Sequence, residues 1–145
     1  MRRLLAAALL TGILDGLFSS VLVTFFYGSN VTRLFTGVAS VPLGKAATAP
    51  LGILIHFGVA FFWSAVFLLL VRRSAWLRRV IASPAGVIEV AAIYGPLIWM
   101  VMSLAVIPLV AHRPPSITPR WWIQFFGHMV FVGLPIVGVI RDGKV

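Results

Sequence analysis

Two histidines, one aspartate and one glutamine are the side chains whose types and spacing suit chemistry inside an apolar environment. His56 and His128 each lie a few residues inside a long apolar stretch, and Gln124 precedes His128 by one helical turn on the same face. At about 1.5 Å of rise per residue, the histidines lie about 8 and about 10 Å below one surface, and Asp15 is a few ångströms deeper. The spacing predicts a polar cluster of Asp15, His56, Gln124 and His128.

Such a cluster suits three kinds of ligand chemistry. Two neutral imidazoles at one depth can ligate a b-type haem, and the two histidines with Asp15 can bind a divalent metal such as zinc. Asp15 and a histidine can also exchange a proton or coordinate a transported ion, as ionisable residues inside membranes commonly do. The plain alternative is structural packing, in which each histidine makes an interhelical hydrogen bond worth about 1 kcal/mol. Packing is the simplest interpretation, and the residues alone leave all four open.

The elements that must position these residues are membrane-spanning helices. The chain has 145 residues, of which 61% are hydrophobic and 10% are charged, and its mean hydropathy is +1.07. Crossing a hydrocarbon core takes about 20 apolar residues, and four stretches qualify: 4–27, 51–71, 85–110 and 121–140. We expect an all-α, polytopic membrane four-helix bundle that forms a single membrane domain over residues 1–145.

A short amphipathic helix is predicted between the first two spans. Apolar residues recur at helical spacing over 31–41, and Ser29 or Asn30 can cap its start by accepting a main-chain N–H bond. We expect this helix to end near Pro42 and Gly44. It is predicted to lie on the outer face, with its apolar side at the headgroup boundary.

The first span carries a stripe of small residues, Gly12, Gly16, Ser19 and Ser20. Small residues let helix backbones approach closely in lipid. This stripe is therefore predicted to pack against another span or another subunit.

Three prolines, Pro96, Pro108 and Pro135, fall inside the predicted spans. A proline removes one intrahelical hydrogen bond and its ring clashes with the preceding turn. We expect bends at these positions.

The distribution of Lys and Arg predicts the orientation. If the N-terminus is inside, eight basic residues, including Lys144, lie on the inner side and four on the outer side, which favours both termini in the cytoplasm. The net charge of +9 lies beside the spans, where anionic lipid headgroups attract it, so no nucleic-acid partner is expected. The predicted interfacial anchors are arginine pairs and tryptophans: Arg72, Arg73, Arg78, Arg79, Trp76, Trp121 and Trp122.

Few side chains in the sequence are suited to act as catalytic groups. The absence of cysteine removes thiolate metal sites and cysteine nucleophiles. Ser19, Ser20 and Ser64 have no glycine-elbow context, and a lone serine in a membrane helix usually bonds to its own backbone. We therefore expect no enzymatic activity.

Four stretches resemble a group of small, uncharacterised four-span bacterial inner-membrane proteins: LFTGVASVPLG (34–44), HFGVAFFWSAVF (56–67), YGPLIWMVMSLAVIPL (94–109) and HMVFVGLPIV (128–137). The resemblance implies a bacterial inner (plasma) membrane location and a helical architecture, and it brings no known activity.

Three functions remain under consideration. The favoured one is a non-enzymatic accessory or scaffolding subunit that associates with other membrane subunits or with itself. The second is a haem- or metal-binding membrane protein that uses His56 and His128. The third is a small ion-coupled transporter, acting as a dimer, that uses Asp15.

Overall fold

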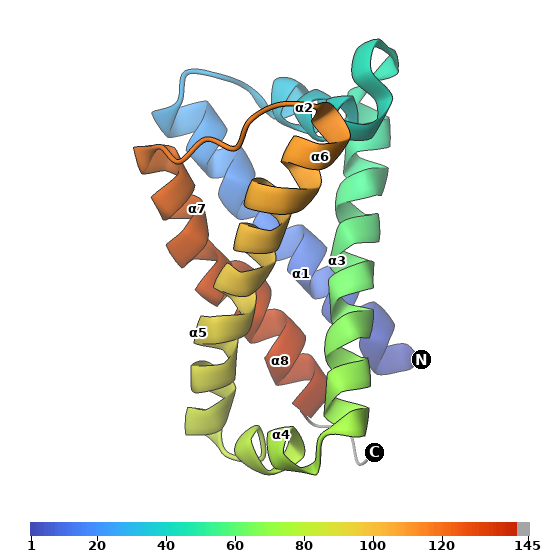
Figure 1. Ribbon diagram of the computed structural model, residues 1–145, viewed down its shortest axis with the longest axis vertical. Coiled ribbons are helices and arrows are strands. Elements are labelled where there is room, and N and C mark those ends of the chain that lie inside the picture. The colour runs from blue at the N-terminus through green and yellow to red at the C-terminus, as the bar shows by residue number, and fades with distance from the viewer. Residues whose placement is uncertain (142–145) are drawn as a thin grey trace.

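The computed structural model describes residues 1–141, and its layout is a bundle of long helices (Figure 1). Four helical segments are long and apolar enough to cross a membrane: Arg2–Phe26, Ala49–Arg73, Pro84–Ala111 and Pro119–Arg141. No strand occurs within the part of the chain that the structure describes. The predicted all-α membrane four-helix bundle is confirmed, and the protein is a multi-pass membrane protein.

Three of the four spans combine α-helix with a wider, π-helical turn. The first span is α1 (Arg2–Val21) followed by the π-turn η1 (Leu22–Phe26), and the second is the uninterrupted α3 (Ala49–Arg73). The third consists of α5 (Pro84–Val101), the π-turn η3 (Met102–Val106) and α6 (Ile107–Ala111), and the fourth of α7 (Pro119–His128), the π-turn η4 (Met129–Gly133) and α8 (Leu134–Arg141). The connections hold α2 (Val31–Leu43), the 3-10 turn η2 (Gly44–Ala46) and α4 (Ala75–Val80).

Prolines explain two of the π-turns. Pro108 and Pro135 each follow the end of a π-turn by two residues. A proline cannot donate to the carbonyl four residues earlier, and its ring crowds that carbonyl. The crowded carbonyls belong to Leu104 and Phe131, inside the widened turns. At Pro108 and Pro135 the expected irregularities therefore take the form of local π-turns, which often accompany functional sites, whereas Pro96 lies inside the continuous α-helix α5.

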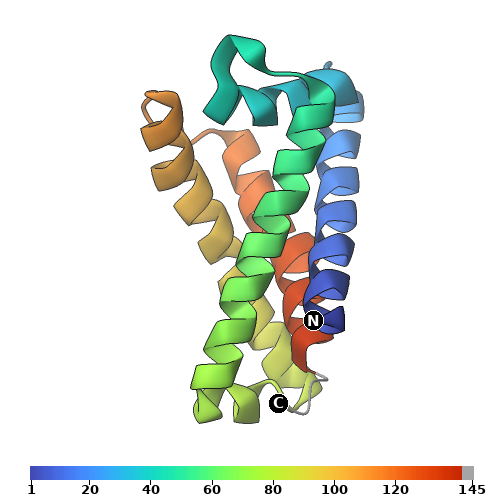
Figure 2. The same ribbon diagram turned by 90° about the vertical axis from the view of Figure 1, so that its right-hand side faces the viewer.

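The two ends of the bundle carry different connections. α2 and the segment 112–118 lie at one end, whereas α4 lies at the other, toward which both ends of the described chain point (Figures 1 and 2). The basic residues separate in the same way. Arg2, Arg3, Arg72, Arg73, Arg78, Arg79 and Arg141 belong to the α4 end, and Arg33, Lys45, Arg113 and Arg120 to the α2 end. Lys144 lies outside the described residues.

An apolar core fills the half of the bundle nearest α4. Phe67, Val71, Ile81, Ile136 and Ile140 are almost completely buried there. In this core the Tyr94 hydroxyl donates a 2.8 Å hydrogen bond to the Trp63 carbonyl, and this bond joins α5 to α3. The side chains of this half of the bundle are packed closely against one another.

The amphipathic helix α2 packs against the protein. Its start is capped as predicted, because the Asn30 side chain accepts a 2.9 Å hydrogen bond from the Arg33 main-chain N–H. Phe35 and Ala39 are buried, and Gly52 of α3 lies so close that any side chain there would meet the Phe35 carbonyl. Part of the apolar face thus covers the end of the bundle, and its expected position at the headgroup boundary stays a prediction.

Candidate functional site

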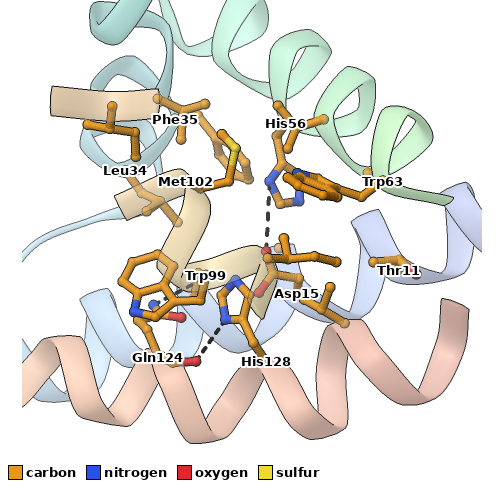
Figure 3. Close-up of a pocket in the computed structure, with 18 of the residues that line it drawn as sticks. Thr11, Asp15, Leu34, Phe35, His56, Trp63, Trp99, Met102, Gln124 and His128 are labelled. Atoms are coloured by element: carbon orange, nitrogen blue, oxygen red, sulfur yellow. Dashed lines mark hydrogen bonds and ion pairs between the residues drawn. The ribbon is translucent and has the colours of Figure 1, made fainter. Parts of the chain in front are cut away.

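A cavity of about 380 Å³ lies beneath α2, in the half of the bundle away from α4. All four spans and α2 contribute to its wall, which is mostly apolar and aromatic (Figure 3). The four residues of the predicted polar cluster all line it. The polar or aromatic lining residues are Thr11, Asp15, Ser19, Phe35, His56, Trp63, Trp99, Gln124 and His128.

His56 is held by the small-residue face of α1. One ring nitrogen, Nε2, lies 2.9 Å from the Gly12 carbonyl oxygen. A carbonyl only accepts hydrogen bonds, so Nε2 carries the proton. A Cβ at Gly16 would lie 3.4 Å from Nε2, an ordinary van der Waals contact, whereas a Cβ at Gly12 would crowd the Phe57 ring, so Gly12 lets α3 come this close. In the neutral ring the other nitrogen, Nδ1, is a free acceptor, and it lies 4.0 Å from Asp15 Oδ2.

His128 is fixed in an equivalent way from the opposite wall. Its Nδ1 lies 2.8 Å from the Gln124 carbonyl oxygen, one turn earlier, and therefore carries a proton. The Trp99 ring lies 4.9 Å from the imidazole, centroid to centroid. Gly95 lets α5 pass directly over the His128 carbonyl. The free nitrogen, Nε2, is on the side of the ring that faces Asp15 (Figure 3).

Asp15 lies between the two imidazoles (Figure 3). Its side chain is only 15% exposed, and Oδ1 has no hydrogen-bond partner. In its neutral form, each imidazole turns the lone pair of its second nitrogen toward this carboxylate. The two nitrogens and the carboxylate oxygens are then all hydrogen-bond acceptors, and none of the three groups donates to another. A proton shared among them would supply that donor, and a buried acceptor left unpaired costs about 1–3 kcal/mol.

Further polar atoms on the cavity wall also lack partners. The Gln124 amide donates a 3.4 Å hydrogen bond to Ser19 Oγ, while its oxygen is unpaired, as are Thr11 Oγ1 and Trp63 Nε1. The sequence singled out Gln124, but it did not indicate Thr11 or Phe35 as cavity residues. Thr11 was visible only as a polar neighbour of Asp15 on the α1 face, and Phe35 only as part of the apolar stripe of α2.

The small-residue stripe packs inside the chain. Gly12 lies against the Phe57 ring and Gly16 against His56, so α3 is the partner of this face. Ser19 contacts Gln124 of α7, and Ser20 is half-buried. Of the two predicted partners, another span and another subunit, the glycines face another span.

The predicted anchors divide into two groups. Trp76 and Trp122 are exposed, and the arginines of 72–79 lie at the α4 end, where Arg78 also donates to the Val71 carbonyl at 2.8 Å. Trp121 differs from the expectation. Its side chain is 7% exposed and its Nε1–H donates a 2.8 Å hydrogen bond to Ser103 Oγ, because this face of α7 turns toward α5 rather than toward lipid.

The geometry does not favour haem or a metal ion. A bis-histidine haem requires both axial nitrogens to face the iron from opposite sides of the macrocycle, whereas here a carboxylate lies between the rings (Figure 3). Zinc sites need at least three close protein ligands. Within residues 1–141 no group of three His, Cys, Asp or Glu side chains is placed to hold a metal ion.

Comparisons with known proteins found no relative of this chain. No protein family, curated protein or solved structure matches the chain. The resemblance of its four stretches to four-span bacterial inner-membrane proteins therefore stays an expectation, and the function has to be inferred from the chemistry of the cavity.

Proposed function

We propose that this protein is a small proton-coupled membrane carrier, and that the cavity around Asp15, His56 and His128 binds a small amphipathic molecule. One observation carries the proposal. Each imidazole commits one N–H to a main-chain carbonyl, at 2.9 Å for His56 and 2.8 Å for His128. Each therefore turns its other nitrogen toward the cavity that holds the carboxylate. Fixing the tautomer through the far nitrogen is how proteins prepare histidine to take a proton or a ligand.

The electrostatics of the bilayer support a proton at this site. A charged carboxylate near the centre of a membrane costs about 2.5–3.5 kcal/mol on insertion scales. A proton bound by the cluster removes that charge or balances it with an imidazolium. A ligand that brings its own charge or hydrogen-bond donors changes the proton affinity of the cluster. Ligand binding and protonation are therefore linked at Asp15.

The surroundings of the cluster suit a ligand-binding site. The cavity volume of about 380 Å³ lies within the range of about 300–1,000 Å³ that is typical of small-molecule sites. Apolar and aromatic walls with a few converging polar groups bind amphipathic molecules. The apolar core on the α4 side closes the cavity toward that end, and α2 covers it at the other.

The accessory-subunit interpretation loses its main support, because the small-residue face that suggested a partner subunit is occupied by α3. For the location we keep the bacterial inner membrane with both termini in the cytoplasm. The support is the excess of arginine at the α4 end, since cytoplasmic loops retain Lys and Arg.

The test is proton movement in proteoliposomes that contain a pH-sensitive dye. Two amphipathic probes are offered in turn, the cation tetraphenylphosphonium and the anion benzoate, against protein-free vesicles that report passive leakage. We expect at least one probe to drive proton movement through the wild type and not through Asp15→Asn. Glu89→Gln is the matched control, because Glu89 is exposed on α5 and does not line the cavity.

A second measurement needs no substrate. In ¹⁵N-histidine spectra the three imidazoles give separate signals, and Asp15→Asn should shift the ring-nitrogen signals of His56 and His128 while leaving those of exposed His112 unchanged. The proposal fails if neither probe moves protons through the wild type. It also fails if Asp15→Asn and Glu89→Gln behave alike in both measurements.

A further inference from the structure

A second hollow, of about 510 Å³, opens at the α2 end beside the cavity. We call it the vestibule. Its wall combines the end of the first span with α6, the segment 112–118 and the start of α7. It shares Trp99, Ile107 and Gln124 with the cavity, so the two spaces adjoin. The charged and hydroxyl-bearing residues of its wall include Tyr27, Arg113, Ser116, Thr118 and Arg120.

The vestibule holds positive charge that no carboxylate among residues 1–141 neutralises. Arg113 and Arg120 both line it, and no carboxylate does. The chain has only three acidic residues. Asp15 faces His56 in the cavity, Glu89 belongs to the second turn of α5 at the far end, and Asp142 lies outside the described residues. No described carboxylate is therefore available to these two guanidinium groups.

The two arginines differ in how they are held. Arg120 lies over the Tyr27 ring, with its guanidinium carbon 4.2 Å from the centroid, a cation–π contact that orients it. The Arg113 main-chain N–H donates to the Pro108 carbonyl at 3.1 Å, and His112 before it adopts a left-handed conformation, with φ 50°. Within residues 1–141 the Arg113 side chain makes no hydrogen bond or ion pair.

Neutral donors stand beside these charges. The Tyr27 hydroxyl is buried and has no hydrogen-bond partner, and the hydroxyls of Ser116 and Thr118 line the same wall. Thr118 is the N-cap residue of α7 but does not use its side chain to cap the helix. Guanidinium groups with hydroxyl donors are the set that recognises phosphate or carboxylate oxygens.

We infer that the vestibule binds an anion that carries a phosphate or carboxylate group, held by Arg113 and Arg120. Because the vestibule lies where the third and fourth spans end, at the level of the lipid headgroups, the anion is either the headgroup of an anionic lipid or a free anion from water. Both present the same oxygens. The site is independent of proton binding at Asp15, although the vestibule adjoins the cavity.

The experiment compares the wild type with Arg113→Gln/Arg120→Gln. Arg33→Gln is the matched control, since Arg33 has the same charge at the same end of the molecule but does not line the vestibule. The thermal midpoint is followed in nanodiscs of phosphatidylcholine with increasing phosphatidylglycerol, and separately in detergent with inorganic phosphate. We expect a saturable rise for the wild type and Arg33→Gln. Charge-assisted hydrogen bonds of about 1.5–3 kcal/mol correspond to about tenfold to hundredfold weaker binding by the double variant.

A response to phosphatidylglycerol alone identifies a lipid headgroup, and a response to phosphate identifies a free anion; either supports the site. Arg113→Gln alone is the second variant, because within residues 1–141 that side chain has no polar partner whose loss could affect folding. Equal responses of the wild type, Arg33→Gln and both vestibule variants would overturn the inference. So would a wild type that responds to neither probe. Proton movement through Asp15 is measured separately and survives either failure.

Discussion

Replacing Gly52 with alanine should lift α2 from the bundle. A Cβ at position 52 would lie 1.7 Å from the Phe35 carbonyl oxygen, whereas real Cβ atoms stay at least 3.0 Å from such neighbours. The difference means that the backbones must separate by at least about 1.3 Å. No side-chain rotation can relieve the clash, because the atoms that meet are a helix carbonyl and a Cβ. Overpacking of this kind costs about 1–3 kcal/mol.

Gly58 of the same helix is the matched control. A Cβ there meets nothing within 4 Å, so Gly58→Ala should leave stability unchanged or raise it by about 0.5–1 kcal/mol through the higher helix propensity of alanine. Unfolding is followed by circular dichroism in mixed dodecylmaltoside–SDS micelles. The SDS fraction at the unfolding midpoint should fall for Gly52→Ala and should stay the same or rise for Gly58→Ala. Loss of stability in both would point to a general sensitivity of α3.

Movement of α2 can be measured directly, because the chain contains no cysteine. Val38 lines the cavity from α2, so Val38→Cys introduces a single thiol whose maleimide labelling reports opening. We expect Gly52→Ala to accelerate labelling severalfold and Gly58→Ala to leave the rate unchanged. Unchanged stability and labelling in Gly52→Ala would refute the conclusion that α2 rests on α3 at this point.

Three further substitutions test other contacts. Gly95→Ala should destabilise the protein by about 1–3 kcal/mol in the same unfolding assay, since its Cβ would meet the His128 carbonyl, whereas Gly138→Ala, which meets nothing, should not. Tyr94→Phe removes the 2.8 Å hydrogen bond to the Trp63 carbonyl and should cost about 0.5–1.5 kcal/mol; an unchanged midpoint would mean that this bond does not hold α3 to α5. Asn30→Ala removes the α2 cap and should cost about 0.5–2 kcal/mol, seen as faster hydrogen exchange in α2; equal exchange would contradict the capping role.

The spans and the polar cluster could be predicted because both follow from distances along a helix. Apolar length identifies a membrane-crossing segment, and rise per residue places His56, His128 and Asp15 at similar depths. The rotation of each helix about its own axis must also bring them together. For these residues, the free-energy cost of facing lipid favours the interior of the bundle. A charged or strongly polar side chain is expensive in lipid, so the direction in which it points is predictable even without a fold.

Apolar and aromatic residues lack that constraint. An apolar face packs equally well on lipid or on protein, so the pattern of α2 did not reveal that Phe35 covers a cavity. Trp121 and Trp122 are adjacent in sequence, yet one is 7% exposed and the other 48%, and composition does not distinguish them. Such choices depend on how the spans cross, which is set by close approaches such as those at Gly95 and Gly133.

Packing and chemistry depend on the same atoms in α1. Gly12 lets α3 come close enough for His56 to reach a main-chain carbonyl, and this bond determines which imidazole nitrogen faces Asp15. A larger residue at position 12 would crowd the Phe57 ring, move α3 away, release Nε2 from the Gly12 carbonyl and allow either nitrogen to carry the proton. Gly12, in a stripe that resembles a simple packing motif, therefore also orients the histidine toward the carboxylate.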